Sequence, residues 1–187
     1  NTVLYAQWES AEPAASVTSG STTTDYGDFS AAVSAWNSAE SGATLKLIAN
    51  VTTGSTVSVS GTKTLDLNGY GIKMTDSGSV ISVTGGASLT LKDSNTDNVT
   101  HRFTIADPSE KGAGLATVND ALESGYKTFM GGYITGGSAS QGGGVYVAGG
   151  TFNMTGGNII GNKTTAKGYY EGGGVALSNN TDSRFVM

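Results

Sequence analysis

A short segment rich in side-chain oxygen atoms, residues 93–97, is the strongest candidate for metal chemistry in this sequence. It places Asp93, Asn95 and Asp97 at alternate positions, which is the spacing of oxygen ligands in a calcium loop. The segment departs from the EF-hand pattern at its sixth position, Asn98, and at its twelfth, Thr104. An Asx-rich turn without metal is the alternative. Calcium is therefore the one candidate cofactor, and no other cofactor is expected.

Acidic residues are too few on the expected strands to favour catalysis there. Glycoside hydrolysis needs two carboxylates within about 10 Å, and calcium-assisted elimination needs gathered carboxylates with a basic residue nearby. The expected outward positions are Lys46, Ser58, Thr64, Asp66, Lys73, Ser82, Thr90 and Lys92. Only Asp66 is acidic, and its expected neighbour in the next repeat is Thr90. Whether the chain is an enzyme stays open, with the pattern leaning against it.

The single histidine, His101, lacks the partners that a zinc site needs. The chain contains one His and no Cys, so zinc would require three carboxylates. We expect His101 to be a surface or loop-packing residue.

Exposed aromatic residues provide the candidate ligand-binding set. Tyr169, Tyr170 and Glu171 lie in the segment KGYYEG, and Tyr126 ends a long irregular segment. Aromatic faces stack on sugar rings, so these residues could form a glycan platform. The alternative is that the tyrosines pack against the flank of neighbouring strands.

Composition excludes several classes of partner. The 187 residues include 15 acidic and 10 basic side chains, for a net charge of −5. The basic residues are dispersed, whereas nucleic-acid binding relies on clusters of them, so no nucleic-acid partner is expected. No run of 18 apolar residues exists, and no membrane insertion is expected.

Repeated apolar pairs indicate the elements that position these residues. Val57 and Val59 return as Ile81 and Val83, and Leu65 and Leu67 return as Leu89 and Leu91, each 24 residues later. Within each pair the spacing is two, which is typical of a strand with one buried face. A fixed period in this range indicates a solenoid. We therefore expect an all-β chain of stacked coils.

A short helix should cover the first coil. Asp28 is a suitable N-cap, Phe29, Val33 and Trp36 share one apolar face, and Gly42 is the expected stop. The predicted organisation is a module tail at residues 1–9, a linker at 10–27, a capping helix at 28–42 and stacked coils at 43–187. The Ser/Thr/Ala-rich composition of residues 10–27 suggests the linker.

The coils are interrupted by irregular segments. We expect excursions at residues 93–100 and 107–127, with a third coil beginning at Phe103 and Ile105 and a helix-like stretch at 116–126. The motif GGGV at residues 142–145 returns at 172–175. Asn68, Asn158 and Asn162 are expected at corners, where they could bond to neighbouring coils.

Two resemblances bear on function. Residues 1–9, NTVLYAQWE, resemble the closing strand of the extracellular repeat of Listeria internalins and many gut-bacterial surface proteins. TLKLIANVT, KTLDLNGYGI and GGGVYVAGGTFNMTGGNIIGN resemble the right-handed parallel β-helix domains, pectate-lyase-like and adhesin-type, of secreted gut-bacterial surface proteins. The second resemblance covers roughly residues 43–187. It implies a right-handed parallel β-helix, a solenoid, at the surface of a Gram-positive bacterium.

The expected function is adhesion by a rigid extracellular module that binds glycans or host surface proteins. One alternative is a fragment of a carbohydrate-active enzyme, a polysaccharide lyase or glycoside hydrolase, with its catalytic residues outside this chain. The other is a passive structural stalk. The opening at Asn1 and the stop at Met187 lead us to expect a fragment whose β-helix is truncated at the C-terminus. Its last coil should then associate edge to edge with a second copy.

Overall fold

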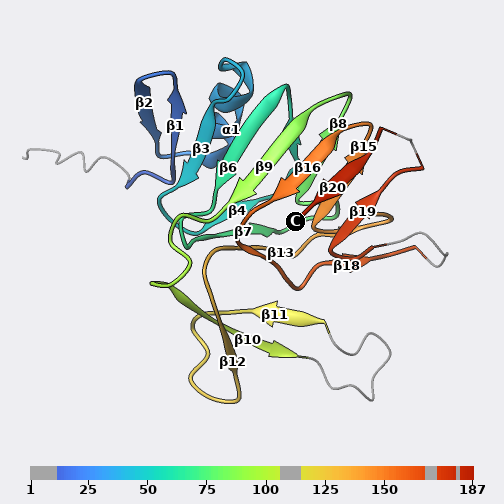
Figure 1. Ribbon diagram of the computed structural model, residues 1–187. Coiled ribbons are helices and arrows are strands. Elements are labelled where there is room, and N and C mark those ends of the chain that lie inside the picture. The colour runs from blue at the N-terminus through green and yellow to red at the C-terminus, as the bar shows by residue number, and fades with distance from the viewer. Residues whose placement is uncertain (1–11, 106–114, 167–171, 180–181) are drawn as a thin grey trace, which may run out of the picture.

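The computed structural model describes residues 12–105, 115–166, 172–179 and 182–187. Strands predominate in these ranges, and they contain one helix, α1 (Phe29–Ser38). The expectation of an all-β chain with a short N-terminal helix agrees with this content. Figure 1 shows a body of long sheets and, below it, a small separate sheet.

Three sheets form the body. The first comprises β1 (Ala15–Ser19), β2 (Thr22–Tyr26), β3 (Thr44–Leu47), β6 (Thr62–Asp66), β9 (Ser88–Lys92), β16 (Thr151–Met154) and β20 (Arg184–Val186). The second comprises β4 (Val51–Thr53), β7 (Gly71–Met74), β13 (Tyr133–Thr135) and β17 (Asn158–Ile159). The third comprises β5 (Val57–Val59), β8 (Ile81–Thr84), β15 (Val145–Ala148) and β19 (Val175–Leu177). A two-stranded sheet pairs β14 (Ser138–Ala139) with β18 (Lys163–Thr164).

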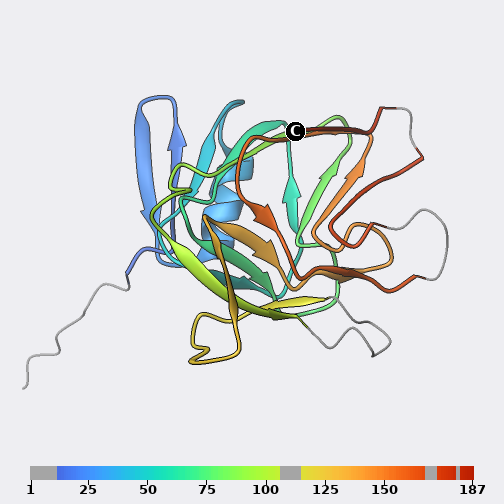
Figure 2. The same cartoon turned by 60° about the horizontal axis from the view of Figure 1, so that its bottom comes forward.

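From β3 onward the chain contributes one strand to the first sheet, then one to the second and one to the third, and it repeats this order. We call one such passage through the three sheets a cycle. Strands of successive cycles pair in parallel within each of these three sheets, and Figure 2 shows them around a common interior. The first sheet is mixed, because β2, β1 and β3 pair antiparallel.

The predicted repeat of 24 residues is correct for one sheet and wrong for another. Val57 pairs with Ile81 in the third sheet, as expected. In the first sheet Leu65 pairs with Leu91, and Leu89 lies opposite Lys63. Two residues separate Val59 from Thr62, whereas four separate their register partners, Val83 and Ser88, and this difference moves the offset from 24 to 26. A shift of two residues keeps every side chain on the same face of the strand, so the buried pattern survives.

The interior is filled by aligned aliphatic side chains. Leu45 pairs with Leu65 and Leu65 with Leu91, and all three are fully buried. Phe152 continues this interior and stacks on Phe185, with ring centroids 5.2 Å apart. Burying one such side chain contributes about 1.5–3 kcal/mol, so these columns supply most of the driving force for folding.

The helix α1 covers the first cycle, as predicted. Asp28 caps it by accepting a hydrogen bond from the Ala31 amide at 2.7 Å. Trp36 is fully buried, and its indole Nε1 donates to the Ala43 carbonyl at 3.0 Å. The helix ends at Ser38, earlier than the predicted stop at Gly42, whose positive φ of 88° belongs to the turn that follows.

The side chain of Lys63 donates hydrogen bonds to backbone carbonyls at the C-terminal end of this helix. Its Nζ donates to the carbonyl oxygens of Ala39, at 2.5 Å, and Glu40, at 3.0 Å. Lys63 is 2% exposed, and this burial lowers the pKa of its ammonium group. A cation at the last carbonyls of a helix is favourable because their dipoles point at it.

The predicted linker at residues 10–27 is wrong over most of its length. Residues 15–26 form the hairpin of β1 and β2, which pairs antiparallel with β3 at the start of the first sheet. Its inward residues Ala15 and Val17 are small and buried, so the segment lacks the large apolar residues by which a strand is recognised. The threonines that suggested a linker are β-branched and suit a strand. Residues 1–9, the predicted module tail, lie outside the described residues.

One insertion separates β9 from β13, and the prediction of a third coil at Phe103 and Ile105 is wrong. Both residues belong to β10 (Thr100–Ile105), which pairs antiparallel with β11 (Ala116–Val118) and with β12 (Lys127–Met130). The helix-like stretch at 116–126 is β11 followed by turns. Alternation alone does not separate a parallel coil from an antiparallel ribbon. The two predicted excursions are parts of this single insertion, residues 93–132.

Within the described residues, no helix has the length and apolar character needed to cross a membrane.

Candidate ligand-binding groove

The insertion leaves the body at Asp93, the first of the calcium candidates. Asp93 Oδ1 accepts hydrogen bonds from the amides of Gly69 (2.7 Å) and Asn95 (3.2 Å). Its Oδ2 accepts from the amide of Gly132 at 2.6 Å. Both carboxylate oxygens are therefore bonded to backbone at the point where the insertion begins and ends.

The other two calcium candidates lie in different surroundings. Asn95 Oδ1 accepts from Asn98 Nδ2 at 2.8 Å, and Asp97 is exposed. Among the described residues, no three His, Asp or Glu side chains lie together in a way that could hold a metal ion. Calcium binding stays a prediction.

His101 lies at the interface between the insertion and the body and contacts both. It is 2% exposed; its Nδ1 lies 2.8 Å from Asp120 Oδ2 and its Nε2 lies 2.8 Å from the Gly69 carbonyl oxygen. Both ring nitrogens of His101 thus lie within hydrogen-bond distance of an oxygen atom, one in the insertion and one in the body. Phe129 and Tyr133 pack on the ring at centroid distances of 5.5 and 4.6 Å. His101 is thus a packing residue between two units, in line with the expectation for it.

Tyr133 lies in the same interface. Burial, with a smaller contribution from the Asp120 carboxylate, raises the pKa of its hydroxyl to about 12. Both effects disfavour the phenolate, since a buried anion loses hydration and an adjacent anion repels it.

A groove of about 200 Å³ lies beside this interface, between the insertion and the body. Its walls are residues 115–118 of the insertion and, from the body, Lys73, Thr135, Lys163 and the glycines Gly136, Gly137 and Gly161. Figure 1 shows β11 running along the side of the body that carries β13 and β18. We call this feature the insertion groove.

The charged residues of the insertion groove are all cationic. Lys73 and Lys163 are exposed and form no ion pair with any other described residue. No carboxylate is found among the described residues that line the groove. Lys73 is on β7, and Thr135, its register partner, is on β13.

Thr135 presents a hydroxyl without a protein partner. The residue is 3% exposed and lines the groove, yet its side chain forms no hydrogen bond with the described residues. No fully buried side-chain nitrogen or oxygen atom of the described residues lacks a partner, so the Thr135 hydroxyl, which has none, reaches the surface of the groove. This hydroxyl is therefore available to a group that enters the groove.

Glycine is required where the insertion approaches the floor of the groove. A Cβ atom at Gly161 would collide with the Ala116 carbonyl oxygen and would lie 2.8 Å from Thr135 Oγ1. The backbone at Gly161 also has a positive φ of 68°, which favours glycine. A side chain at this position would both displace β11 and fill the groove.

The structure describes only one of the four predicted ligand-binding residues. Tyr126 is half-buried, and the guanidinium carbon of Arg102 lies over its ring, 4.6 Å from the ring centroid. This contact agrees with the alternative in which the tyrosines pack against neighbouring strands. Tyr126 does not line the groove. Tyr169, Tyr170 and Glu171 lie outside the described residues.

The residues that do line the groove were only partly visible in the sequence. Lys73 was expected at an outward position, but nothing in the sequence linked it to Thr135 or Lys163. The one available signal was the long insertion itself, because binding residues concentrate on loops held by a rigid scaffold.

Asp66 is a structural residue and not a candidate catalyst. It is 2% exposed, its Oδ1 accepts from the amides of Asn68 and Ser94, and its Oδ2 lies 3.3 Å from Lys92 Nζ. Its register neighbour is Lys92, so the expected pairing with Thr90 is wrong. The two-residue shift of the first sheet is the reason. Asn68 itself donates to the Leu47 carbonyl of the previous cycle, as predicted for the corner asparagines.

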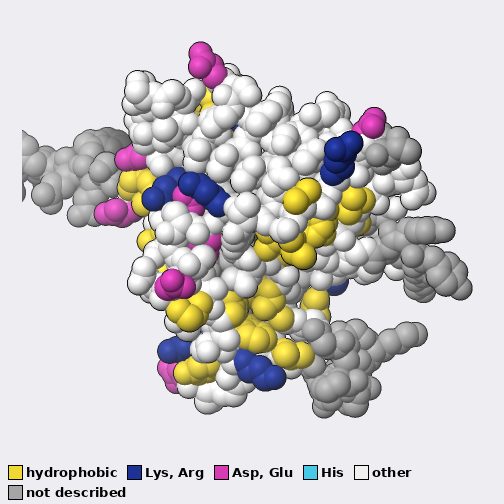
Figure 3. Space-filling model, in the orientation of Figure 1, with side chains coloured by type: hydrophobic (Ala, Val, Ile, Leu, Met, Phe, Trp, Pro, Cys, Tyr) yellow, Lys and Arg dark blue, Asp and Glu magenta, His cyan; other side chains and the backbone are white. Residues whose placement is uncertain are grey.

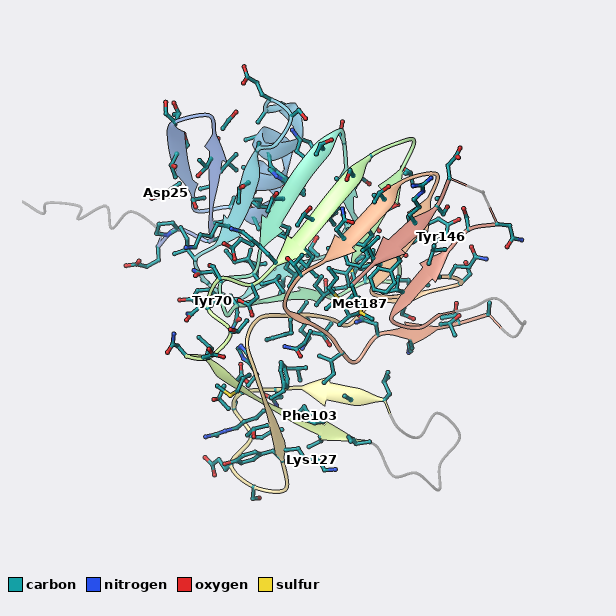
Figure 4. All side chains as sticks on the ribbon, viewed as in Figure 1. Asp25, Tyr70, Phe103, Lys127, Tyr146 and Met187 are labelled. Carbon is teal, nitrogen blue, oxygen red and sulfur yellow. The ribbon has the colours of Figure 1, made fainter. Side chains whose placement is uncertain are left out.

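A second hollow, of about 330 Å³, lies near Tyr146 and is lined by Ser79, Ser140 and Gln141. Ser79 Oγ donates to the Gln141 carbonyl at 3.3 Å, so part of this lining is already paired. Figure 4 places Tyr146 away from the insertion, whose Phe103 and Lys127 are labelled. The insertion groove combines unpaired cations with an unpaired hydroxyl and is the stronger candidate.

Comparison of the chain with family models, with curated proteins and with solved structures gives no match.

Proposed function

We propose that the chain is an extracellular module of a Gram-positive bacterial surface protein that adheres to glycans or host surface proteins. We further propose that its body is a right-handed parallel β-helix. The cyclic visiting of three sheets and the parallel pairing of successive cycles support this architecture. The motif resemblances of residues 43–187 support the surface location.

The observation that carries the proposal is the insertion groove. It is open, it lies between the body and the inserted sheet, and it presents two lysines without ion pairs and a hydroxyl without a hydrogen bond among the described residues. Groups of this kind recognise a ligand, because they gain hydrogen bonds that the protein itself does not supply.

Binding without chemical conversion is favoured by the residues in the groove. Hydrolysis of a glycosidic bond uses two carboxylates, and the described lining residues supply none. A carbohydrate-active enzyme with catalytic residues elsewhere, and a passive stalk, are the two alternatives.

A binding and turnover screen of this chain separates the three functions. We expect a defined set of polysaccharides to bind on a glycan array and to be recovered at unchanged length. Shortened products would indicate the enzyme, and a complete lack of binding to glycans and host surface proteins would indicate the stalk.

The matched variants for this screen are Lys73→Gln/Lys163→Gln and Lys127→Gln. All three lysines are exposed, but Lys127 lies on β12, whereas the groove is bounded by β11 on the other side of β10. Loss of binding in the double variant, with binding retained in Lys127→Gln, is the result that we expect.

A further inference from the structure

We infer that the insertion groove binds an anionic group, a carboxylate or a sulfate carried by an acidic polysaccharide. This inference rests on the proposed glycan-binding function and specifies the ligand of that site.

The first argument is charge complementarity. The chain as a whole has a net charge of −5, yet the charged groups among the described residues that line the groove are two ammonium groups. Neither ammonium group is neutralised by a described carboxylate. Hydrogen bonds between an ammonium group and an oxyanion are among the strongest in proteins, so a negative ligand group gains more here than a neutral one.

The two lysines of the groove come from different cycles of the body. Lys73 belongs to β7, Thr135 to the next strand β13, and Lys163 to the following cycle, where β18 pairs with β14. Neighbouring strands lie about 4.8 Å apart. Thr135 thus comes from the cycle between those of the two lysines, and all three residues line the groove.

The second argument is the hydroxyl itself. The Thr135 hydroxyl forms no hydrogen bond with the described residues and lies at the wall of the groove, so it can donate to an oxyanion that enters. Thr135 would thus contribute a directed hydrogen bond, while the lysines contribute charge.

The third argument is size. The groove volume of about 200 Å³ is below the roughly 300–1,000 Å³ of pockets for drug-sized ligands. It can take one charged sugar residue, and Leu115 and Val118 contribute to its lining. A longer chain would continue outside the groove.

The test is a titration of the intact chain with three polymers of different charge. Hyaluronan carries carboxylates, dextran sulfate carries sulfates, and dextran is neutral. We expect one of the two anionic polymers to bind, with dextran binding at least about tenfold more weakly, and the affinity to fall as sodium chloride is raised. Preference between the anionic polymers identifies the carboxylate or the sulfate.

Three variants complete the test. Lys73→Gln and Lys163→Gln should each weaken binding about tenfold, the size expected for one charge-assisted hydrogen bond. Thr135→Val, which keeps the shape, should weaken it about three- to tenfold. Lys127→Gln should leave it within about twofold. Unchanged melting temperatures show that the variants are folded.

The outcomes separate the inference from the proposed function. Binding of neutral glycans that is insensitive to salt and to Lys73→Gln overturns the inference and leaves the adhesive function in place. Equal losses in Lys127→Gln and Lys73→Gln also overturn it, because binding would then follow net charge. Failure to bind any glycan, charged or neutral, overturns the inference, and failure to bind host surface proteins as well overturns the proposed function.

Discussion

The Asp93 carboxylate accepts a hydrogen bond from the Gly132 amide at 2.6 Å, although the two residues are 39 positions apart in the sequence. Asp93 is the first residue of the insertion, and Gly132 is the last. The same carboxylate accepts from Gly69 of the preceding cycle. One side chain therefore joins both ends of the insertion to the body, and the insertion groove depends on that joint.

Replacing Asp93 should destabilise this joint. Asp93→Ala leaves the amides of Gly69 and Gly132 without their acceptor, and each unpaired buried amide costs about 1–3 kcal/mol. We expect the free energy of unfolding in urea to fall by about 2–4 kcal/mol. Asp97→Asn, at an exposed position of the same segment, is the control and should change it by less than about 0.5 kcal/mol. Equal effects would contradict the structural role of Asp93.

Chelation of divalent cations should leave stability unchanged. Both oxygens of Asp93 are already bonded to backbone amides, so calcium would have to displace those hydrogen bonds. We expect the same melting temperature in EDTA and in millimolar calcium. A melting temperature that rises with calcium concentration would support the calcium site at Asp93, Asn95 and Asp97 instead.

Alkaline pH should loosen the interface around His101 through Tyr133. The pKa of Tyr133 rises from 10.0 to about 12 on folding, so the folded state retains the proton in a pH range where the unfolded chain loses it. This contribution to stability is complete below pH 10 and is lost as the pH rises toward 12. Its size is on the order of 2–3 kcal/mol.

The variant Tyr133→Phe tests whether ionisation of Tyr133 causes the loss of stability at alkaline pH. The Tyr133 hydroxyl forms no hydrogen bond with described residues, so the variant should be nearly as stable as the wild type at pH 7. Between pH 9 and pH 11.5 its free energy of unfolding should fall less steeply than that of the wild type. If the free energy of unfolding had the same pH dependence in both proteins, Tyr133 would not be the origin of the alkaline destabilisation.

Lys63 should stabilise the cap formed by α1. Lys63→Met keeps most of the aliphatic stem but leaves the Ala39 and Glu40 carbonyls without their donor. We expect a loss of about 1–3 kcal/mol in urea unfolding. Lys46→Met, on the neighbouring strand β3 and without an ion pair among the described residues, is the matched control. A stabilised Lys63→Met variant would show that the cost of burying the ammonium group outweighs its hydrogen bonds.

The end of the body that is formed by β19 and β20 should associate with a second copy of the chain. β19 and β20 are the last strands of their sheets, and Leu177, Val186 and Met187 are among the exposed large hydrophobic residues. Figure 3 shows hydrophobic side chains gathered in several patches on the face of the molecule that it presents. Sedimentation should reveal concentration-dependent dimers that Val186→Lys abolishes. Ile105→Lys, on the insertion, should leave them intact, and a monomer at every concentration would reject this interface.

The interior of the fold was predictable from the sequence because burial repeats with a period of two. Val57, Ile81, Leu65 and Leu91 are all buried, whichever exact pairing the strands adopt. The register of the first sheet was not predictable, since it depends on two additional corner residues that preserve the alternation. The hairpin β1–β2 was missed because its buried side chains are small and lie under α1.

The candidate site was harder to predict because its parts meet only in three dimensions. Lys73 and Lys163 are 90 positions apart, and β11 approaches them only because His101 and Asp93 hold the insertion against the body. The side chain of Thr135 has no feature in the sequence that marks it as unpaired. Its role follows from burial and from hydrogen bonds that are absent among the described residues.

The insertion also has a consequence for how such a protein can diversify. Ile72 pairs with Ile134 directly across it, so the sheets continue as if the intervening residues were not there. Doubling the length of a closed loop costs only about 0.6 kcal/mol. Segments of other lengths and compositions can therefore replace this one between the same two anchoring residues. Recognition can change by exchange of a single stretch of gene, while the scaffold and its folding remain as they are.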